Sequence, residues 1–446
     1  MLKITPKNLL HPDYPFAPKN FPFFYGWIIL IVCTIGIIMS IPGQTIGVSA
    51  FTNYLLTATG LSRLQFSNAY FVGTLTSGLL LPYGGVLLDR VGARATAVCA
   101  SVGLALTLCY LSFSDRLATV INNTFPILPY STVVFIILVL GFICLRFSGQ
   151  GMLTMTSRTT IGKWFDRRRG FVSGLTGVFV AFGFSIAPLA MSSLINVLGW
   201  RATWLTMAAV VGIGMGLIGW AFYRDNPEEC GLLMDGEMHS STVETKHSSE
   251  NNLQDFTRAE AIRTIIFWVV TLALSSEALI LTGITFHIVD IGAEVGLSQM
   301  EAVSIFLPKA VISTIIGYLV GMVSDRVPLK YLFMVMMVGE AIGIASIANF
   351  GSPLFRLLTI VGFGISGGCF GTLSAVALPR FFGRAYLGSI SGFQMMIMVI
   401  ASAIGPSFLA LFKDKLGSYQ PGLYGCLILA ILIFILTFFA RNPRKY

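Results

Sequence analysis

The chain has 446 residues, of which 55% are hydrophobic and 11% charged, and its formal net charge is +9. A soluble domain carries far more charge, so this composition excludes an ordinary soluble enzyme and indicates an integral membrane protein. The positive charge alone would also suit a nucleic-acid-binding protein, so its placement along the chain has to decide between the two.

A helix needs roughly 20 mostly apolar residues to cross the hydrocarbon core of a bilayer, and about twelve such segments are present. We therefore expect an all-α membrane protein. In chain order the segments are 26–50, 67–88, 95–113, 132–154, 171–195, 202–222, 265–288, 301–323, 331–349, 357–378, 387–412 and 422–440. The polar stretch between the sixth and seventh predicts an N-terminal half over 1–222, a cytoplasmic linker over 223–263 and a C-terminal half over 264–446.

With the N-terminus placed inside, most Lys and Arg residues fall in loops on the inner side. The residues left elsewhere are Arg63, Arg116, Arg201, Arg356, Lys413 and Lys415 outside, and Arg146 and Lys309 in the membrane. This asymmetry follows the positive-inside rule, which explains the net charge without DNA or RNA as a partner. We expect a multi-pass protein of the cell (inner or plasma) membrane, in contact with lipid, with both termini cytoplasmic.

The loop after the second segment, Gly85–Arg94 (GVLLDRVGAR), recurs after the eighth as Gly321–Lys330 (GMVSDRVPLK). A glycine allows another helix to approach closely, and an aspartate can accept from a helix N-terminus or pair with arginine. A basic loop that only sets topology is the simpler interpretation. The recurrence favours a conformational latch, for which the candidates are Gly85, Asp89, Arg90, Arg94, Asp325 and Arg326.

A second set of residues also recurs with almost constant spacing. The first copy comprises Gly170, Gly174, Pro188 and Gly199, and the second comprises Gly388, Gly392, Pro406 and Gly417. Two such repeats favour a tandem duplication that forms two pseudo-symmetric six-helix bundles. Internal repeats of this kind are typical of transporters that move one half against the other.

The Gly85–Arg94 loop resembles the signature loop of the major facilitator superfamily, with a departure at Ala93. The aromatic-Gly-Trp at 25–27 and the stretch Lys163–Gly170 are similar to the monocarboxylate and oxalate:formate branch. The resemblance implies a twelve-helix transporter. It does not carry over a substrate, because Gln44-Thr45 stands where animal monocarboxylate carriers have lysine in span one, and Lys309 where carriers of this branch have arginine in span eight.

Four charged residues lie inside predicted spans, namely Arg146, Glu277, Lys309 and Glu340. Each costs ~2.5–3.5 kcal/mol at a helix centre, so each must pair, bind substrate or line a wet cavity. The resemblance implies that spans one, four, seven and ten line the central cavity. This places Arg146 and Glu277 on lining helices and Glu340 on an outer one, where a structural pair is favoured over a function.

Arg146 has two interpretations. It is a clamp for a substrate carboxylate, with Gln150 one turn along and Gln44 in span one, or it resembles the span-four arginine tied to proton movement or structure. Lys309 either extends outward to the membrane surface or is the second cationic contact of the substrate. Glu277 either carries a coupled proton or is a permanent counter-ion of Lys309.

We therefore predict secondary transport of a small organic anion, monocarboxylate-like, by rocker-switch alternating access, with proton coupling or exchange. Export of hydrophobic drugs is the alternative, since Gly183–Pro188 (GFSIAP) half-resembles an antiporter motif. A non-transporting membrane receptor is less favoured, because the chain keeps both the membrane charges and the latch residues. The sequence shows no P-loop, metal-ligand cluster or nucleophile–base pattern, so we predict no enzyme activity, no cofactor and no metal.

Overall fold

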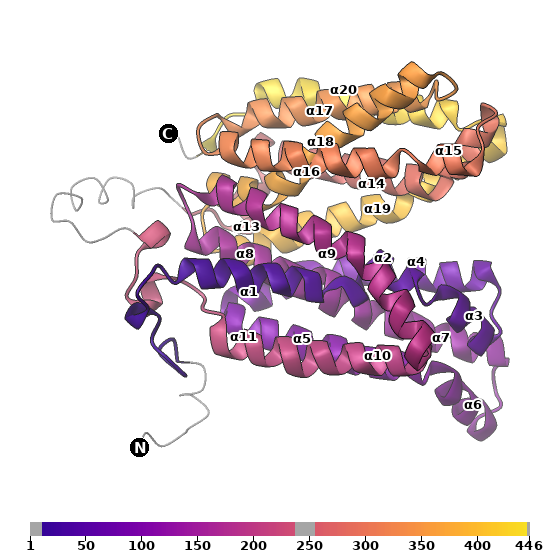
Figure 1. Cartoon of the computed structure of the whole chain (residues 1–446), viewed down its shortest axis with the longest axis horizontal. Helices are drawn as coiled ribbons and strands as arrows, with labels where there is room; N and C mark the ends of the chain where they lie inside the picture. Colours follow the sequence, from indigo (N-terminus) through magenta and orange to yellow (C-terminus); the bar gives the residue numbers. More distant parts are fainter. Residues whose placement is uncertain (1–10, 237–254, 444–446) are drawn as a thin grey trace. The chain divides into compact units, whose positions relative to one another are not determined.

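The structure is a computed structural model that describes residues 11–236 and 255–443. Within these ranges every regular element is a helix (Figure 1). Among the described residues, twelve helical runs are long and apolar enough to span a membrane: Gly26–Gly43, Leu64–Val91, Ala93–Ser112, Tyr130–Trp164, Arg169–Leu198, Trp200–Phe222, Ile265–Glu294, Met300–Ser324, Leu329–Ile347, Pro353–Phe382, Leu387–Leu416 and Gln420–Phe439. They confirm the predicted all-α membrane fold with twelve spans. Large apolar side chains are exposed along them, as a lipid-facing surface requires.

Three spans of the first half are interrupted. In the first, α1 (Gly26–Met39) ends before the 3₁₀ turn η2 (Ile41–Gly43), and the chain resumes as α2 (Thr45–Ser49) and α3 (Thr52–Thr59). In the fourth, α7 (Tyr130–Arg146) and α8 (Thr154–Trp164) are joined by the π-helix η3 (Phe147–Leu153). The sixth has a similar π-helix, η4 (Val210–Met215), between α10 (Trp200–Ala209) and α11 (Gly216–Phe222). Such π-helices frequently mark functional sites.

The other helices of the first half are regular: α4 (Arg63–Val91), α5 (Ala93–Ser112), α6 (Ser114–Thr124) and α9 (Arg169–Leu198). The second half comprises α13 (Arg258–Ile262), α14 (Ile265–Glu294), α15 (Gln299–Val303), α16 (Phe306–Ser324), α17 (Leu329–Ile347), α18 (Pro353–Phe382), α19 (Leu387–Leu416) and α20 (Gln420–Phe439). The spacing of Thr257 and Glu260 predicts a capping box at the start of a short helix, and α13 confirms it.

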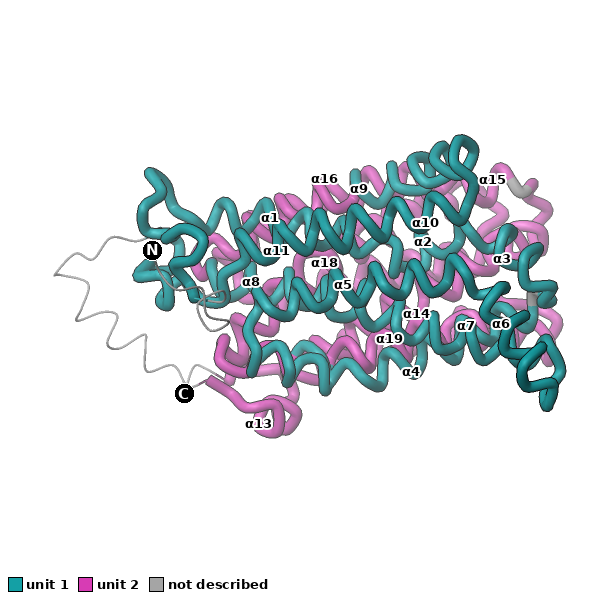
Figure 2. Tube along the Cα trace, turned by 90° about the horizontal axis from the view of Figure 1, so that it is seen from below, with its two compact units in different colours: residues 1–164, 182–238, 391–393 teal, residues 165–181, 239–390, 394–446 magenta. Residues whose placement is uncertain are grey.

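The chain forms two compact units (Figure 2). Unit 1 comprises residues 1–164, 182–238 and 391–393, and unit 2 comprises 165–181, 239–390 and 394–446. The chain-order division into 1–222, 223–263 and 264–446 rests on the sequence and stays a prediction. Residues 237–254 of the predicted linker lie outside the described part of the chain.

Each unit contains one close helix crossing at the repeated glycines. In unit 1, a Cβ added to Gly392 of α19 would lie 3.2 Å from the Cα of Gly85 on α4. In unit 2, a Cβ added to Gly174 of α9 would lie 3.4 Å from the Cα of Gly321 on α16. These are corresponding positions of the two sequence repeats, so the repeat in the sequence is also a repeat of contacts.

Candidate functional site

The interruption of the first span places Gln44 between η2 and α2. Its backbone is extended, and its side-chain Nε2 donates to the hydroxyls of Ser40 at 3.1 Å and Thr154 at 3.4 Å. The same interruption turns the backbone carbonyl of Gly43 and the hydroxyl of Thr45 toward the fourth span. Pro42 and Gly43 explain why the helix stops here, since a proline cannot donate a backbone hydrogen bond and a glycine weakens a helix.

Arg146 is the last residue of α7 and is 4% exposed. Its Nη1 donates to the Gly43 carbonyl at 3.4 Å and to the Thr45 hydroxyl at 3.3 Å, both of them long contacts. The guanidinium carbon lies 5.5 Å from the centre of the Tyr70 ring, and the Tyr70 hydroxyl donates to Thr45 at 3.0 Å. The Arg146 Nε has no hydrogen-bond partner among the described residues.

No carboxylate pairs with Arg146 in the described ranges, where its charge is met only by a carbonyl, a hydroxyl and an aromatic face. A buried guanidinium of this kind is suited to a carboxylate, which it binds through two parallel hydrogen bonds. Gln150 lies in η3 and is partly buried, and Gly149 beside it packs so closely against Gly43 that a Cβ added to Gly149 would lie 2.8 Å from the Gly43 Cα. Unit 1 therefore brings Gln44, Arg146 and Gln150 to one place, where the interruptions of two spans cross.

Unit 2 holds a second group of charges. Glu277 on α14 is 1% exposed, and neither carboxylate oxygen has a hydrogen-bond partner among the described residues. Lys309 is in the first turn of α16 and is partly buried. A Cβ added to Gly367 of α18 would lie 3.6 Å from the Lys309 Nζ and 3.7 Å from the Glu277 Oε1. The two side chains thus point into the same space beside a glycine, and they form no direct ion pair with each other.

Glu340 on α17 is fully buried and accepts a hydrogen bond from the Ser276 hydroxyl at 2.8 Å. The expectation for this residue was a structural ion pair. Among the described residues no cation pairs with it, and its Oε2 has no partner. Its position next to Glu277 was not apparent from the sequence, because Glu340 is far away along the chain and lies on a helix expected to be peripheral.

The second copy of the repeated loop forms a helix cap in unit 2. The Asp325 carboxylate accepts from the backbone N–H groups of Gly170 at 2.7 Å and Phe171 at 3.1 Å, at the start of α9. Burial raises the pKa of Asp325, against the opposing effect of these two N–H donors and of nearby Arg380 and Arg169. Arg326 is exposed. This is one of the two contacts anticipated for an aspartate in this loop, the acceptance of hydrogen bonds from a helix N-terminus.

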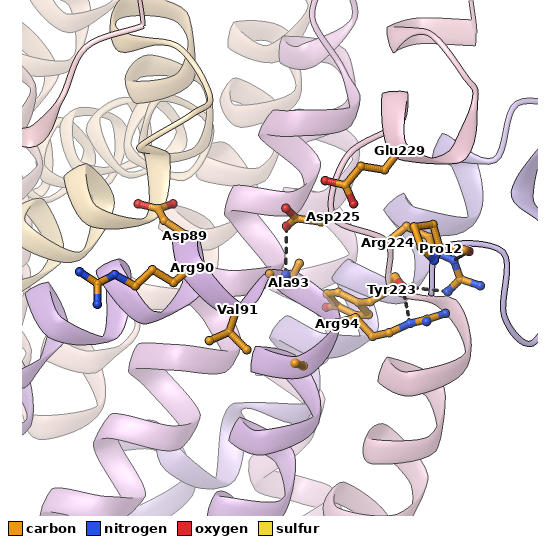
Figure 3. A pocket seen from close by; sticks show the side chains of 12 residues that line it. Pro12, Asp89, Arg90, Val91, Ala93, Arg94, Tyr223, Arg224, Asp225 and Glu229 are labelled. Carbon is orange, nitrogen blue, oxygen red and sulfur yellow. Dashed lines mark hydrogen bonds between the residues drawn. The ribbon is translucent and has the colours of Figure 1, made fainter. Parts of the chain in front are cut away.

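The first copy of the loop lines a cavity of about 290 Å³ in unit 1 (Figure 3). Asp89 and Arg90 are on one side of it and Asp225 on the other, where Asp225 accepts from the Ala93 N–H at 3.0 Å and from the Lys163 ammonium at 3.0 Å. Gly85 is buried at the crossing with Gly392, and Arg90 is exposed.

Arg94, the last residue of this loop motif, is buried and binds backbone carbonyls. It donates to the carbonyls of His11 at 3.0 Å, Tyr223 at 3.2 Å and Tyr14. Arg224, which the sequence did not single out for a role, donates to the carbonyls of Pro12, Tyr14 and Phe16. Burial lowers the pKa of Arg224 from its usual range. The two arginines together hold the segment 11–16 against the rest of unit 1.

The residues that sequence reasoning missed are mainly neutral ones. Tyr70, Thr45, Ser276 and Gly367 complete the two charged groups. Tyr70 and Gly367 carry no motif that would single them out, whereas Thr45 belongs to the Gln44-Thr45 pair and Ser276 directly precedes Glu277. A contact of the Tyr70 type is the easiest of these to anticipate, because an aromatic residue can stack on an arginine. Nothing in the sequence says which aromatic residue that is.

Comparison with known proteins identifies the family of the chain. Residues 30–406 match the profile of a family described as "Major Facilitator Superfamily". The chain is 28% identical to human monocarboxylate transporter 6 over 193 residues, which are 42% of this chain and 33% of that protein. It is 23% identical to human monocarboxylate transporter 10 over 81% of this chain and 67% of that protein. The chain thus spans a third of the first relative and two thirds of the second.

Among solved structures, the proton:xylose symporter XylE superposes with a TM-score of 0.67 at 17% identity, over 93% of this chain and 95% of that one. The transporter FucP in its outward conformation superposes with a TM-score of 0.66 at 14% identity, over 95% of this chain and all (100%) of that one. At these identities the likeness concerns the fold alone.

Proposed function

Because the chain belongs to the Major Facilitator Superfamily, a family of transporters rather than enzymes, we propose that it moves a small organic anion by rocker-switch alternating access. The transport is coupled to protons or runs as exchange. The observation that supports an anionic substrate is the environment of Arg146. This residue is buried in unit 1, makes long contacts to neutral oxygens and has no carboxylate partner in the described ranges. The similarity to monocarboxylate transporters supports the same substrate class.

Each unit contributes one cation to this proposal. Arg146 is the carboxylate clamp, with Gln44 and Gln150 as neutral neighbours, and Lys309 is the second cationic contact. Glu277 is the proton carrier, because it is buried beside Lys309 and its oxygens lack hydrogen-bond partners among the described residues. A carboxyl group in such a place changes its charge when the cation beside it is engaged by an anion.

The conformational latch belongs to the same proposal. Asp325, capping α9, and Asp89, at the corresponding place of the first repeat, hold one conformation of the carrier together with Gly85, Arg90, Arg94 and Arg326. For placement in the cell, we propose the cell membrane with both termini cytoplasmic, since most basic loops then face the cytoplasm.

The direct test is uptake of labelled lactate, pyruvate, oxalate and a dicarboxylate into proteoliposomes, with and without an inward proton gradient. Saturable uptake that the gradient stimulates supports proton-coupled anion transport, and saturable exchange without stimulation supports an exchanger. If folded protein takes up none of these anions, the anion proposal is overturned. Drug export then becomes the favoured function, and Arg146 has a structural role.

A further inference from the structure

Glu340 has an environment that a purely structural residue does not need. It is on α17, which packs against α14, α16, α18 and α20, and its side chain is 0% exposed. Burying a carboxyl group in a membrane protein is costly unless the group is paired or changes its charge. Among the described residues, Ser276 is its one hydrogen-bonding neighbour.

The titratable groups near Glu340 come from α14 and α20, and those beside Glu277 extend the cluster to α18 and α16. Glu277 from α14 lies within electrostatic reach of it, as does Cys426 from α20. Cys369 from α18 and Lys309 from α16 lie beside Glu277. Within the described ranges this group therefore contains two carboxyls and one ammonium. Charge balance in a low-dielectric interior requires that one of the two carboxyls carries a proton.

The hydrogen bonds of Ser276 indicate which carboxyl that is. The Ser276 hydroxyl oxygen lies 2.8 Å from the Glu340 Oε1 and 3.2 Å from the Ala273 carbonyl oxygen. A hydroxyl has one hydrogen to donate, so an ionised Glu340 competes with the Ala273 carbonyl for it, whereas a protonated Glu340 can donate its own hydrogen and leave that of Ser276 to Ala273. In this arrangement Glu340 donates to Ser276, Ser276 donates to Ala273, and the ionised Glu277 faces Lys309.

We propose that Glu340 is a second proton-holding residue of this carrier and that Glu277 and Glu340 act as one proton-binding pair. The inference rests on the proposed function. The pair holds one proton while Lys309 is free and two while an anion occupies Lys309. When the anion arrives, the proton on Glu340 passes to Glu277, and Glu340 takes another from the aqueous phase. One proton is thus bound per monoanion, and the group stays neutral throughout.

The variant Glu340→Gln tests this in proteoliposomes. An amide keeps the size of the side chain and a hydrogen bond to Ser276 but cannot exchange a proton. We expect it to lose uptake driven by a proton gradient and to keep exchange of unlabelled for labelled anion, which needs no net proton movement. Retention of both activities would overturn the proposal, because a merely structural acid predicts that result. Loss of both, in protein that elutes as a folded species, would also contradict it.

Substitutions at two neighbouring serines distinguish a role of Ser276 in positioning Glu340 from an effect on folding. Ser276→Ala removes the hydrogen bond to Glu340 and should weaken gradient-driven uptake while exchange continues. Ser275→Ala removes the neighbouring buried hydroxyl, which has no partner among the described residues, and should leave both activities unchanged. Equal effects of the two substitutions would count against the role of Ser276 as a positioning residue.

A measurement without substrate tests this inference independently of which anion is transported. Infrared spectra of the purified carrier should show a protonated buried carboxyl group that is absent in Glu340→Gln and that shifts after transfer to D₂O. The shift would show that the proton on Glu340 exchanges with solvent even if none of the tested anions is transported. A carboxyl band that Glu340→Gln leaves intact, or one that never exchanges, would refute the proposal.

Discussion

At the scale of single residues, the two units compensate buried charge in different ways. Arg146 in unit 1 is surrounded by a carbonyl, a hydroxyl and the face of Tyr70, all of them neutral. Lys309 in unit 2 has an acidic neighbour, Glu277, and through it Glu340. In our proposal the first arrangement attracts an incoming negative charge, and the second holds a movable proton.

The geometry of the guanidinium should matter at position 146, beyond its charge. Arg146→Lys keeps the cation but loses the planar pair of donors, so the KM for a transported anion should rise roughly tenfold, about 1.4 kcal/mol. Arg146→Ala should abolish uptake. Arg116→Lys, at an exposed arginine that also lies over an aromatic ring, is the control and should change nothing. An unchanged KM in Arg146→Lys would show that a point charge suffices.

An ion pair at the end of the sixth span should make stability depend on pH. Arg201 donates to Asp115 at 2.8 and 2.5 Å, and these hydrogen bonds hold the pKa of Asp115 below its usual range. A lowered folded-state pKa means that the stabilisation is present above the unfolded pKa and is lost as the pH falls through the folded one.

Asp115→Asn should therefore lower the stability of the detergent-purified protein by about 1 kcal/mol at neutral pH. The difference in Tm between variant and wild type should vanish in strong acid. Asp414→Asn, at an exposed aspartate, is the control and should leave Tm unchanged at every pH. A difference that persists in acid would assign the effect to packing instead of charge.

At the scale of elements, close packing at glycines determines where the helices cross. A Cβ added to Gly170 of α9 would lie 2.0 Å from the Ser324 hydroxyl oxygen and 2.3 Å from the Gly321 carbonyl oxygen. Backbone atoms cannot move aside as a flexible side chain can, so α9 and α16 need a residue without a side chain here.

Gly170→Ala should destabilise the protein by roughly 1–3 kcal/mol, as overpacking does. It should also disturb the cap that Asp325 forms on α9. Gly177→Ala lies on the same helix and meets no atom within 4 Å, so it should be neutral. Thermal unfolding followed by tryptophan fluorescence distinguishes the two variants. Equal stability in both would mean that the crossing adapts to a methyl group.

The existence of the helices could be predicted from the sequence, whereas their interruptions could not. A run of apolar residues specifies a span because lipid leaves no alternative for the backbone. The π-helix after Arg146 depends on packing against η2, the 3₁₀ turn of another span, and no local pattern encodes that contact. Gly43 and Gly149 are the residues whose lack of a side chain allows this contact.

At the scale of the whole molecule, the duplicated sequence has become a duplicated set of contacts. Gly85 meets Gly392 in one unit and Gly321 meets Gly174 in the other. This correspondence could be anticipated from spacing alone, because equal offsets imply equal positions in two copies of one fold. The partners of the charged side chains could not be anticipated in this way, because tertiary packing brings Tyr70, Ser276 and Gly367 next to them.

The cap of Asp325 on α9 should have a global effect. Asp325→Asn removes the charge that accepts from the Gly170 and Phe171 N–H groups, so the conformation held by this contact should lose population. Transport by Asp325→Asn should fall several-fold at unchanged protein level, and Asp325→Glu should restore part of it. Full transport by the well-expressed amide variant would remove Asp325 from the latch.

The grip of Arg94 and Arg224 on the segment 11–16 has a consequence for how that segment tolerates change. Both arginines bind main-chain oxygens, which every amino acid possesses, so these hydrogen bonds are independent of the side chains there. The rings of Tyr14 and Phe16 add contacts with Trp220 and Phe222. Alanine substitutions would remove these ring contacts and keep the hydrogen bonds to both arginines. Deleting the segment would instead remove hydrogen-bond acceptors from two interior cations at once and leave each with the Tyr223 carbonyl, so this stretch is an integral part of the folded unit.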